Sequence, residues 1–148
     1  MTPDPEKVAE AVTAAMMRTD AAAAHNGVTV RSVQPGVVSV QVTLAQHHLN
    51  GHGNCHGGLL FLLADTALGL ACNSHGPMAV AAGADIVFAR PARIGETLVA
   101  TARERDRFGR SGLYDVTVTR GDEVIAEFRG RTRVVAQSQP GSDGVMVT

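Results

Sequence analysis

The chain has 148 residues, of which 45% are hydrophobic and 18% charged, and its formal net charge is −1. This length predicts one globular domain with a sizeable core. A nearly neutral chain lacks the strongly basic face that nucleic-acid binding needs, so no nucleic-acid partner is expected. The first ten residues lack the basic-then-apolar order of a signal peptide. Cys55 and Cys72 show no disulfide-framework spacing, so we expect reduced thiols and a cytoplasmic protein.

The N-terminal part of the chain predicts one helix followed by two strands. Residues 4–6 form a helix start, with a capping aspartate, a proline and a glutamate near the positive end of the dipole. Apolar residues then recur at helical spacing, and the helix is expected to end before His25. Residues 28–33 and 37–44 are rich in valine and flank a Gln-Pro-Gly turn signal. Valines alternate with polar residues in the second segment, which indicates a half-buried antiparallel strand.

Residues 57–74, GGLLFLLADTALGLACNS, predict a helix that is apolar on every side and therefore buried on every face. The stretch is too short and too interrupted for a membrane span, so no membrane partner is expected. Its one charged residue is Asp65. A bare carboxylate in a low dielectric costs several kcal/mol unless it is paired, hydrogen-bonded or next to a wet cavity. A chemical role explains Asp65 better than folding does.

The rest of the chain predicts four further strands and a loose end. The strand-like segments are residues 78–90, 97–107, 113–120 and 124–135. Residues 137–148 are rich in Ser, Gly and Gln and predict a flexible tail after a single domain over residues 1–136. Strands enclosing one central helix indicate an α+β architecture.

The start of the apolar helix predicts a site for a developing oxyanion. Gly57 and Gly58 let a ligand approach unpaired backbone N–H groups at the positive end of the helix dipole. Asp65 is a candidate general base or nucleophile. Gly58 and Asp65 are seven residues apart, or roughly 10 Å along the helix axis, whereas hydrogen-bond reach is about 3 Å. Two antiparallel copies could bring the start of one helix to the middle of the other, so we infer a two-fold dimer with two shared sites.

Three segments carry a resemblance to a known family. N-G-H-x-x-C-H-G-G over residues 50–58, the helix with A-D-T and A-C-N-S, and the later F-x-R-P are similar to the hotdog-fold acyl-CoA thioesterases of phenylacetic acid breakdown. The resemblance implies a sheet wrapped around a central helix, and a dimer joined edge to edge that is often paired into a homotetramer. It also implies hydrolysis of aryl- or hydroxyaryl-acetyl-CoA thioesters. No cofactor is expected.

The resemblance also implies roles for individual residues. Asp65 corresponds to the catalytic carboxylate, supplied in trans, and Gly57 to the backbone N–H that binds the thioester oxygen. The other catalytic candidates are Asn50, which would orient water or the carbonyl, His56, which would brace the glycine turn, and Thr66 beside the acid. The candidates for substrate binding are Gly58, His52, Phe61, Arg90 and Arg110, the two arginines being candidates for the phosphates of coenzyme A.

Each candidate also has a purely structural interpretation. Asp65 could be a buried acid paired to an arginine, the two glycines could serve helix–sheet packing, and Asn50 could be a turn residue. The alternating arginines of residues 103–107 and 129–133 could form a solvated sheet face. The histidines of residues 47–56 alternate with glycines at irregular spacing, so no metal site is expected.

Two other functions stay open from the sequence. A hotdog hydratase or dehydratase of acyl thioesters would place a histidine, His56 or His52, beside the acid. A non-catalytic acyl-CoA binding protein would bind without releasing thiol and would tolerate the loss of the acid at Asp65.

Overall fold

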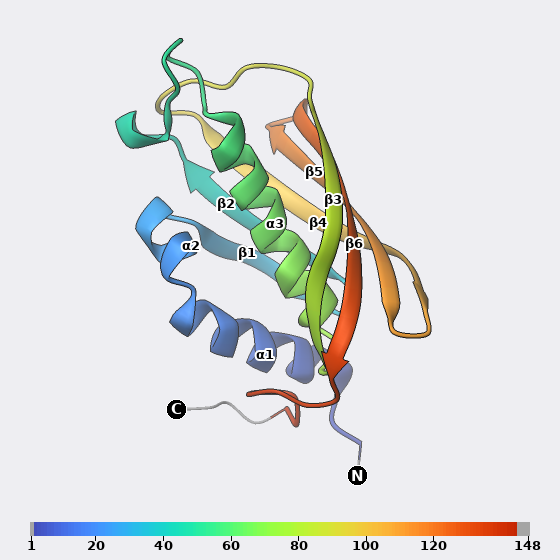
Figure 1. Ribbon diagram of the computed structural model, residues 1–148. Helices are drawn as coiled ribbons and strands as arrows, with labels where there is room; N and C mark the ends of the chain where they lie inside the picture. Colours follow the sequence, from blue (N-terminus) through green and yellow to red (C-terminus); the bar gives the residue numbers. More distant parts are fainter. Residues whose placement is uncertain (1, 145–148) are drawn as a thin grey trace.

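One antiparallel sheet wrapped around one long helix forms the core of the fold (Figure 1). The computed structural model describes residues 2–144. Its strands are β1 (Thr29–Gln34), β2 (Val37–Thr43), β3 (Met78–Phe88), β4 (Thr97–Phe108), β5 (Ser111–Arg120) and β6 (Glu123–Ala136). Its helices are α1 (Pro5–Thr19), α2 (Ala21–Asn26) and α3 (Gly57–Asn73), with a short 3-10 turn, η1 (Gln46–His48), before the loop that leads into α3. All six predicted strands and the central helix are therefore present, with ends that move by a few residues.

The strand order is β1-β2-β4-β5-β6-β3, and every neighbouring pair is antiparallel. β2 and β3 are consecutive strands that lie far apart in the sheet, and α3 is the connection that crosses between them. This crossover leaves β3 as a free edge strand. Within β2, Val38, Val40 and Val42 are buried as predicted, but Ser39 on the opposite face is buried too, so the alternation is only partial.

The prediction of a single N-terminal helix is wrong at one point. The helix breaks at Asp20, whose backbone leaves the helical region at φ −79° and ψ 88°. The Asp20 carboxylate accepts a hydrogen bond from the Ala23 N–H at 2.9 Å and so starts a second helix, which includes His25. Because aspartate is a strong N-cap, it stabilises the break as well as the restart.

α3 packs closely into the concave face of the sheet. Leu63, Leu68 and Leu70 are buried among the valines of the strands. Gly130 of β6 allows the closest approach, since a Cβ atom there would lie 2.6 Å from Leu68 Cδ2. None of the helices formed by residues 2–144 is long and apolar enough to cross a membrane.

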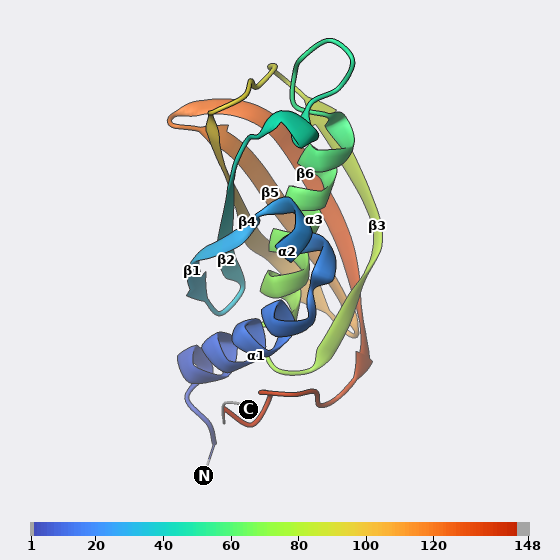
Figure 2. The ribbon, with the colours of Figure 1, turned by 90° about the vertical axis from the view of Figure 1, so that its left-hand side faces the viewer.

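The prediction that α3 is buried on every face is wrong for the single chain. Gly58, Phe61 and Asp65 are exposed, and Leu62 and Thr66 beside them are half-buried. These positions recur every three or four residues and form one stripe along the helix. Figure 2 shows α2 in front of α3 and β3 to the right of it. Phe61 and Leu62 of this stripe are as apolar as the residues on the buried sides, which is why the sequence does not distinguish them from the core.

The C-terminal segment packs against the helices as far as residue 144. Gln139 donates from Nε2 to Asn73 Oδ1 at 2.8 Å and to the Gly76 carbonyl at 3.0 Å. Gly141 is buried, and a Cβ atom there would lie 2.7 Å from the Ala11 backbone. Residues 139–141 of the segment predicted to be a flexible tail therefore contact the rest of the domain, whereas residues 145–148 lie outside the described part of the chain.

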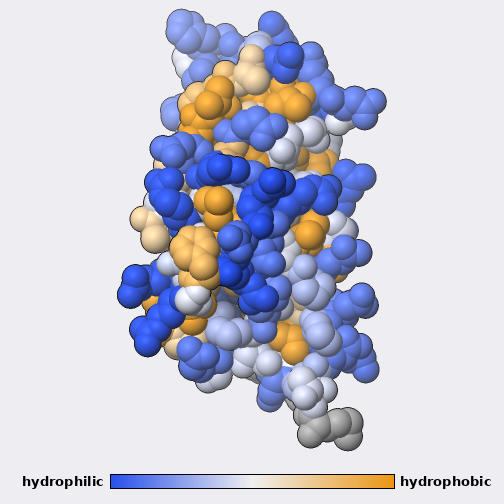
Figure 3. All heavy atoms as spheres, turned by 90° about the vertical axis from the view of Figure 1, so that its right-hand side faces the viewer, coloured by the Kyte–Doolittle hydropathy of each residue, from blue (hydrophilic) through white to orange (hydrophobic). Residues whose placement is uncertain are grey.

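The outer face of the sheet carries ion pairs between neighbouring strands. Arg129 binds both carboxylate oxygens of Asp115, at 2.7 and 2.8 Å, and Arg105 approaches the same carboxylate at 3.5 Å. Arg131 lies 3.3 Å from Asp85 of β3. Figure 3 shows a band of hydrophilic side chains across the face opposite α1 and α2, with separate apolar spots. These arginines accord with a solvated sheet face.

Candidate active site

The loop before α3 is organised by the side chain of Asn50. Its carbonyl oxygen, Oδ1, accepts hydrogen bonds from the backbone N–H groups of His52 at 2.9 Å and Asn54 at 3.1 Å. These two donors fix the orientation of the side-chain amide. The amide nitrogen, Nδ2, has no hydrogen-bond partner among residues 2–144. Asn50 is therefore a turn residue that also keeps one donor free for a ligand.

In the first turn of α3, the backbone N–H of Gly58 is hydrogen-bonded and the preceding one, that of Gly57, is free within residues 2–144. His56 is the N-cap, and its Nδ1 accepts a hydrogen bond from the Gly58 N–H at 2.8 Å. The Gly57 N–H comes one position earlier and makes no hydrogen bond within the described chain. A free N–H at the positive end of a long helix is a favourable place for an oxygen with developing negative charge.

The free N–H opens into a pocket of about 420 Å³ at the start of α3. Its wall includes Asn50, Gly57 and the segment that follows β3, with Phe88 and Arg90. A Cβ atom on Gly57 would lie 3.0 Å from the Phe88 ring, so glycine allows the ring to lie against the helix start. Cys55 also lines this pocket, but burial raises the pKa of its thiol to about 11. Because the thiol stays protonated at neutral pH, it is a poor nucleophile.

Asp65 lines a different hollow, an open groove of about 530 Å³ between α3, β3 and the junction of α1 with α2. Its carboxylate makes no hydrogen bond or ion pair with any residue from 2 to 144. The arginine partner that a structural role would require is therefore absent from this part of the chain. Partial burial raises the pKa of Asp65, and the negative charge of Asp20 raises it further. Both effects favour a carboxylate that accepts a proton readily.

Two predicted residues flank Asp65 in this groove. The Thr66 hydroxyl donates to the Leu62 carbonyl one turn earlier at 2.8 Å, so its hydrogen is already used. The ring of Phe61 meets Phe128 edge to face, with centroids 5.1 Å apart, and presents its other side to the groove. This contact supplies a flat apolar wall next to the acid.

The remaining predicted residues lie apart from one another. His52 is exposed in the loop and lines neither the Gly57 pocket nor the Asp65 groove. Arg90 lies at the wall of the Gly57 pocket, where it donates to the Val124 carbonyl at 2.9 Å. Arg110 lines a cavity of about 80 Å³ with Cys72, at the other end of α3. Within one chain, Arg110 is therefore not part of either hollow.

The groove also contains residues that carry no functional signal in the sequence. Met16, Asp20 and Ala22 form its N-terminal wall, and Val80 and Ala81 of β3 form the opposite wall. Asp20 is recognisable in the sequence as a helix cap before a run of alanines, but not as a neighbour of Asp65. That proximity arises only when α2 packs beside α3.

Residues 52–127 match the family model described as the thioesterase superfamily. The acyl-coenzyme A thioesterase PaaI of Escherichia coli K12 is 41% identical over 128 residues, which are 86% of this chain and 91% of the relative. The chain belongs to the thioesterase superfamily. This assignment confirms the predicted thioester hydrolase and favours it over a hydratase and over a non-catalytic binding protein.

Solved structures place the fold in the same thioesterase superfamily. The structure of E. coli PaaI, from the phenylacetic acid degradation operon, has a TM-score of 0.88 and 38% identity, and the match covers 91% of this chain and 99% of that one. The smu.793 protein of Streptococcus mutans UA159, bound to acetyl CoA, has a TM-score of 0.73 and 27% identity over 76% of this chain and 91% of that one. The predicted α+β hotdog fold of this thioesterase is thereby confirmed.

Proposed function

We propose that the protein is an acyl-CoA thioesterase whose active site is shared between two copies of the chain. The name of the E. coli relative and the acetyl CoA in the S. mutans structure support a coenzyme A thioester as substrate. The operon of the E. coli relative supports an aryl- or hydroxyaryl-acetyl group on the acyl side. Phe61 and Phe88, at the two hollows, are aromatic surfaces suited to such a ring.

The observation that carries the proposal is a free donor and a free acceptor on the same helix, in separate hollows. The Gly57 N–H and the Asn50 amide face one hollow, and the unpartnered Asp65 carboxylate faces the other. Gly57 and Asp65 lie on the same helix but too far apart to act on one carbon atom. A second copy running antiparallel would bring the Gly57 pocket of one subunit to the Asp65 groove of the other.

In this arrangement the thioester oxygen accepts a hydrogen bond from the Gly57 N–H, and the Asn50 amide orients the carbonyl or the water. Asp65 of the partner subunit acts as general base, taking a proton from water as the water oxygen bonds to the carbonyl carbon. The negative charge on the tetrahedral oxygen is stabilised at the helix start by about 3 kcal/mol per donor. Breaking the C–S bond then releases the coenzyme A thiolate and the free acid.

Asp65 has a second possible role as a nucleophile. Its oxygen would then bond to the carbonyl carbon, expel the thiolate and form a mixed anhydride that water cleaves. A single turnover in H₂¹⁸O tests the nucleophilic role. Attack of water on the enzyme side of the anhydride places the label in the Asp65 carboxylate, whereas a general base, or attack of water on the acyl side of the anhydride, places it in the product acid.

The edge of the sheet supports the second copy. Within residues 2–144, no strand pairs with the outer side of β3, and its side chains Met78, Val80, Val87 and Phe88 are exposed by 37 to 66%. An exposed apolar edge strand is a site for pairing with another chain. Together with the uncovered stripe of α3, it supports a homodimer joined through β3, and we propose that two such dimers form a homotetramer. The phosphates of coenzyme A would meet Arg90 at the wall of the Gly57 pocket.

Complementation between two variants tests the shared site. Asn50→Asp keeps the oxygen acceptor of the loop but replaces the free donor, and Asp65→Asn removes the carboxylate charge. Each homo-oligomer should release little thiol from phenylacetyl-CoA. A purified heterodimer of the two would have one intact site and one doubly defective site, and should recover about half of the wild-type rate. A site built within one chain predicts no recovery at all.

A further inference from the structure

Asp20 places a second carboxylate at the groove that contains Asp65. It lies between α1 and α2, and both carboxylates line the same hollow. One oxygen of Asp20 is held at 2.9 Å by the Ala23 N–H, so the charge is fixed in place by the cap of α2. The wall of the groove therefore carries a negative charge whose position is held by a hydrogen bond to the backbone.

Among residues 2–144, the lining of the groove contributes no cation that would compensate the two carboxylates. β3 contributes Ala79, Val80 and Ala81 to the groove, and none of these side chains ionises. Met16 and Ala22 from the N-terminal helices are apolar. The other lining residues from α3 carry no charge: Gly58, Phe61, Leu62, Thr66, Gly69, Leu70 and Asn73. The Cys72 thiol, which also interacts with Asp65, has a pKa raised to about 12 by burial and therefore stays neutral.

We propose that Asp20 is a positioning residue of the thioesterase site, whose fixed negative charge makes Asp65 a stronger base. Two like charges that face one groove with apolar walls repel each other more strongly than they would in water. Asp65 relieves this repulsion when it takes up the proton of the attacking water. Because a general base works best when its proton affinity matches the working pH, the charge of Asp20 assists that step without touching the substrate. This inference rests on the proposed function of Asp65.

Asp20 also has a structural role as a helix cap, and the test must separate this role from the effect of its charge on Asp65. Asp20→Asn keeps an N-cap oxygen of nearly equal strength and removes the charge. Asp20→Ser does the same with a different side chain, so that a folding defect in one variant does not decide the result. The control is Asp4→Asn, because Asp4 caps α1 by accepting a hydrogen bond from the Glu6 N–H at 3.0 Å and does not line the groove.

The experiment measures the charge effect with and without catalysis. The pH dependence of kcat/KM for phenylacetyl-CoA, with a thiol reagent that works in acid, reports the group that must be deprotonated. Carbon-13 NMR of the aspartate carboxyl carbons reports the titration of Asp65 in the enzyme without substrate. In Asp20→Asn and Asp20→Ser, both the acid limb of kcat/KM and the Asp65 titration should move to lower pH. In Asp4→Asn neither should move.

An Asp65 titration that stays at the wild-type pH in both Asp20 variants would overturn the inference. An equal displacement in Asp4→Asn would overturn it too, because it would reflect only the overall charge of the protein. Asp65→Asn separates this outcome from a failure of the proposed function. If that variant hydrolyses phenylacetyl-CoA at the wild-type rate, Asp65 is not the base, whatever its titration shows.

Discussion

The two ends of α3 differ in whether their polar groups are hydrogen-bonded within the chain. At the C-terminal end, the buried side chain of Asn73 donates to the carbonyls of Gly69 and Ala79, at 2.7 and 2.9 Å. Its oxygen accepts from the Ala79 N–H at 2.9 Å and from Gln139 at 2.8 Å. Ser74 adds a bridge to the β1–β2 turn, because its hydroxyl accepts from the Gly36 N–H at 2.8 Å. This end of the helix ties together segments far apart in the sequence.

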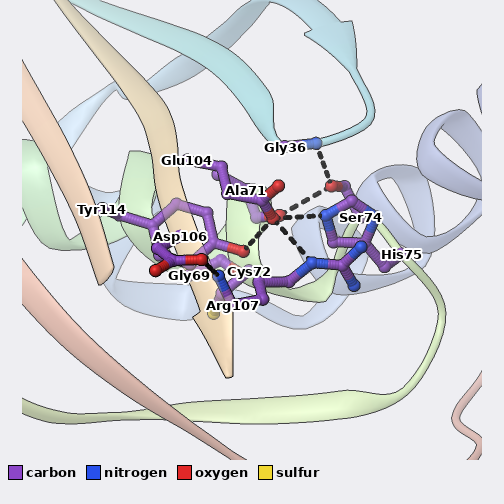
Figure 4. A network of polar contacts seen from close by, with 10 residues as sticks. All are labelled: Gly36, Gly69, Ala71, Cys72, Ser74, His75, Glu104, Asp106, Arg107 and Tyr114. Atoms are coloured by element: carbon purple, nitrogen blue, oxygen red, sulfur yellow. Dashed lines mark hydrogen bonds and ion pairs between the residues drawn. The ribbon is translucent and has the colours of Figure 1, made fainter. Parts of the chain in front are cut away.

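A carboxylate at that end has several donors around it. Glu104 of β4 accepts hydrogen bonds from His75 at 2.7 Å and from Tyr114 at 3.0 Å, and Arg107 lies 3.0 Å from the same oxygen (Figure 4). These side chains come from β4, β5 and the turn after α3. The network therefore contributes to stability by holding the sheet to the end of the helix.

The N-terminal half of the same helix leaves its polar groups without partners. The Gly57 N–H, the Asn50 amide nitrogen and the Asp65 carboxylate form no hydrogen bond within residues 2–144. Each of these groups lies at an open hollow, where a ligand, water or another chain can complete it. The difference separates a stabilising end from the proposed reactive end, and each prediction below tests that separation.

Replacing Asp65 should have the largest effect on activity. Asp65→Asn should lower kcat for phenylacetyl-CoA by about 10²–10⁴-fold, because a neutral amide cannot accept the proton of water. The midpoint of thermal unfolding should stay the same or rise, since the variant loses a desolvated charge without a partner. Thiol release and calorimetry on the same preparation check both. A large loss of stability would mean that Asp65 is part of the folding core after all.

Replacing Asn73 should lower stability and leave activity nearly unchanged, the opposite of the result expected for Asp65. Asn73→Ala leaves the Ala79 N–H and carbonyl buried without partners, which should cost about 2–4 kcal/mol of unfolding free energy. The kcat of the remaining folded enzyme should change less than about threefold, because Asn73, although it lines the same groove, lies eight residues beyond Asp65, or roughly 12 Å along the helix axis. Urea unfolding measures the free energy of unfolding. Thiol release, normalised by active-site titration, measures kcat. A selective loss of kcat at full stability would contradict the division between the two ends.

Replacing His56 should have an intermediate effect, because it serves both stability and the site. His56→Ala removes the acceptor of the Gly58 N–H and should cost about 1 kcal/mol of stability. The same change frees the glycine turn, and we expect kcat/KM to fall about tenfold through misplacement of the Gly57 N–H. His56→Asn keeps an N-cap acceptor and should restore most of both. If His56→Asn recovers stability but not kcat/KM, the histidine acts on the substrate and not only on the turn.

The contrast between the ends also explains what the sequence could predict. Periodic valines, the helix from Gly57 and the loop glycines are local signals, and they predicted the strands, the central helix and the free helix start. The open stripe of α3 was not predictable, because Phe61 and Leu62 are as apolar as residues buried by the chain itself. The proximity of Asp20 to Asp65 and the docking of Gln139 onto Asn73 arise only from packing of distant segments. Local patterns therefore identify which groups can react, and packing decides which groups surround them.

The smallest effect is expected from Glu104, and it depends on pH. Burial alone would raise the pKa of Glu104, but the hydrogen bonds from His75 and Tyr114 and the charges of His75 and Arg107 outweigh it, and the pKa is below its usual 4.5. A carboxylate with a lowered pKa stabilises the fold above the pKa of the unfolded chain and loses this contribution as the pH falls through the folded value.

Glu104→Gln should therefore be less stable than the wild type by about 1 kcal/mol at pH 7, since the network is partly exposed to solvent. The difference should stay constant down to about pH 5 and shrink below the unfolded pKa of 4.5. Urea unfolding of both proteins between pH 3 and 7 measures it. Because this carboxylate already has donors, its loss should leave kcat unchanged, whereas the unpartnered carboxylate of Asp65 should affect kcat and not stability. A pH-independent difference would show that Glu104 contributes packing rather than charge.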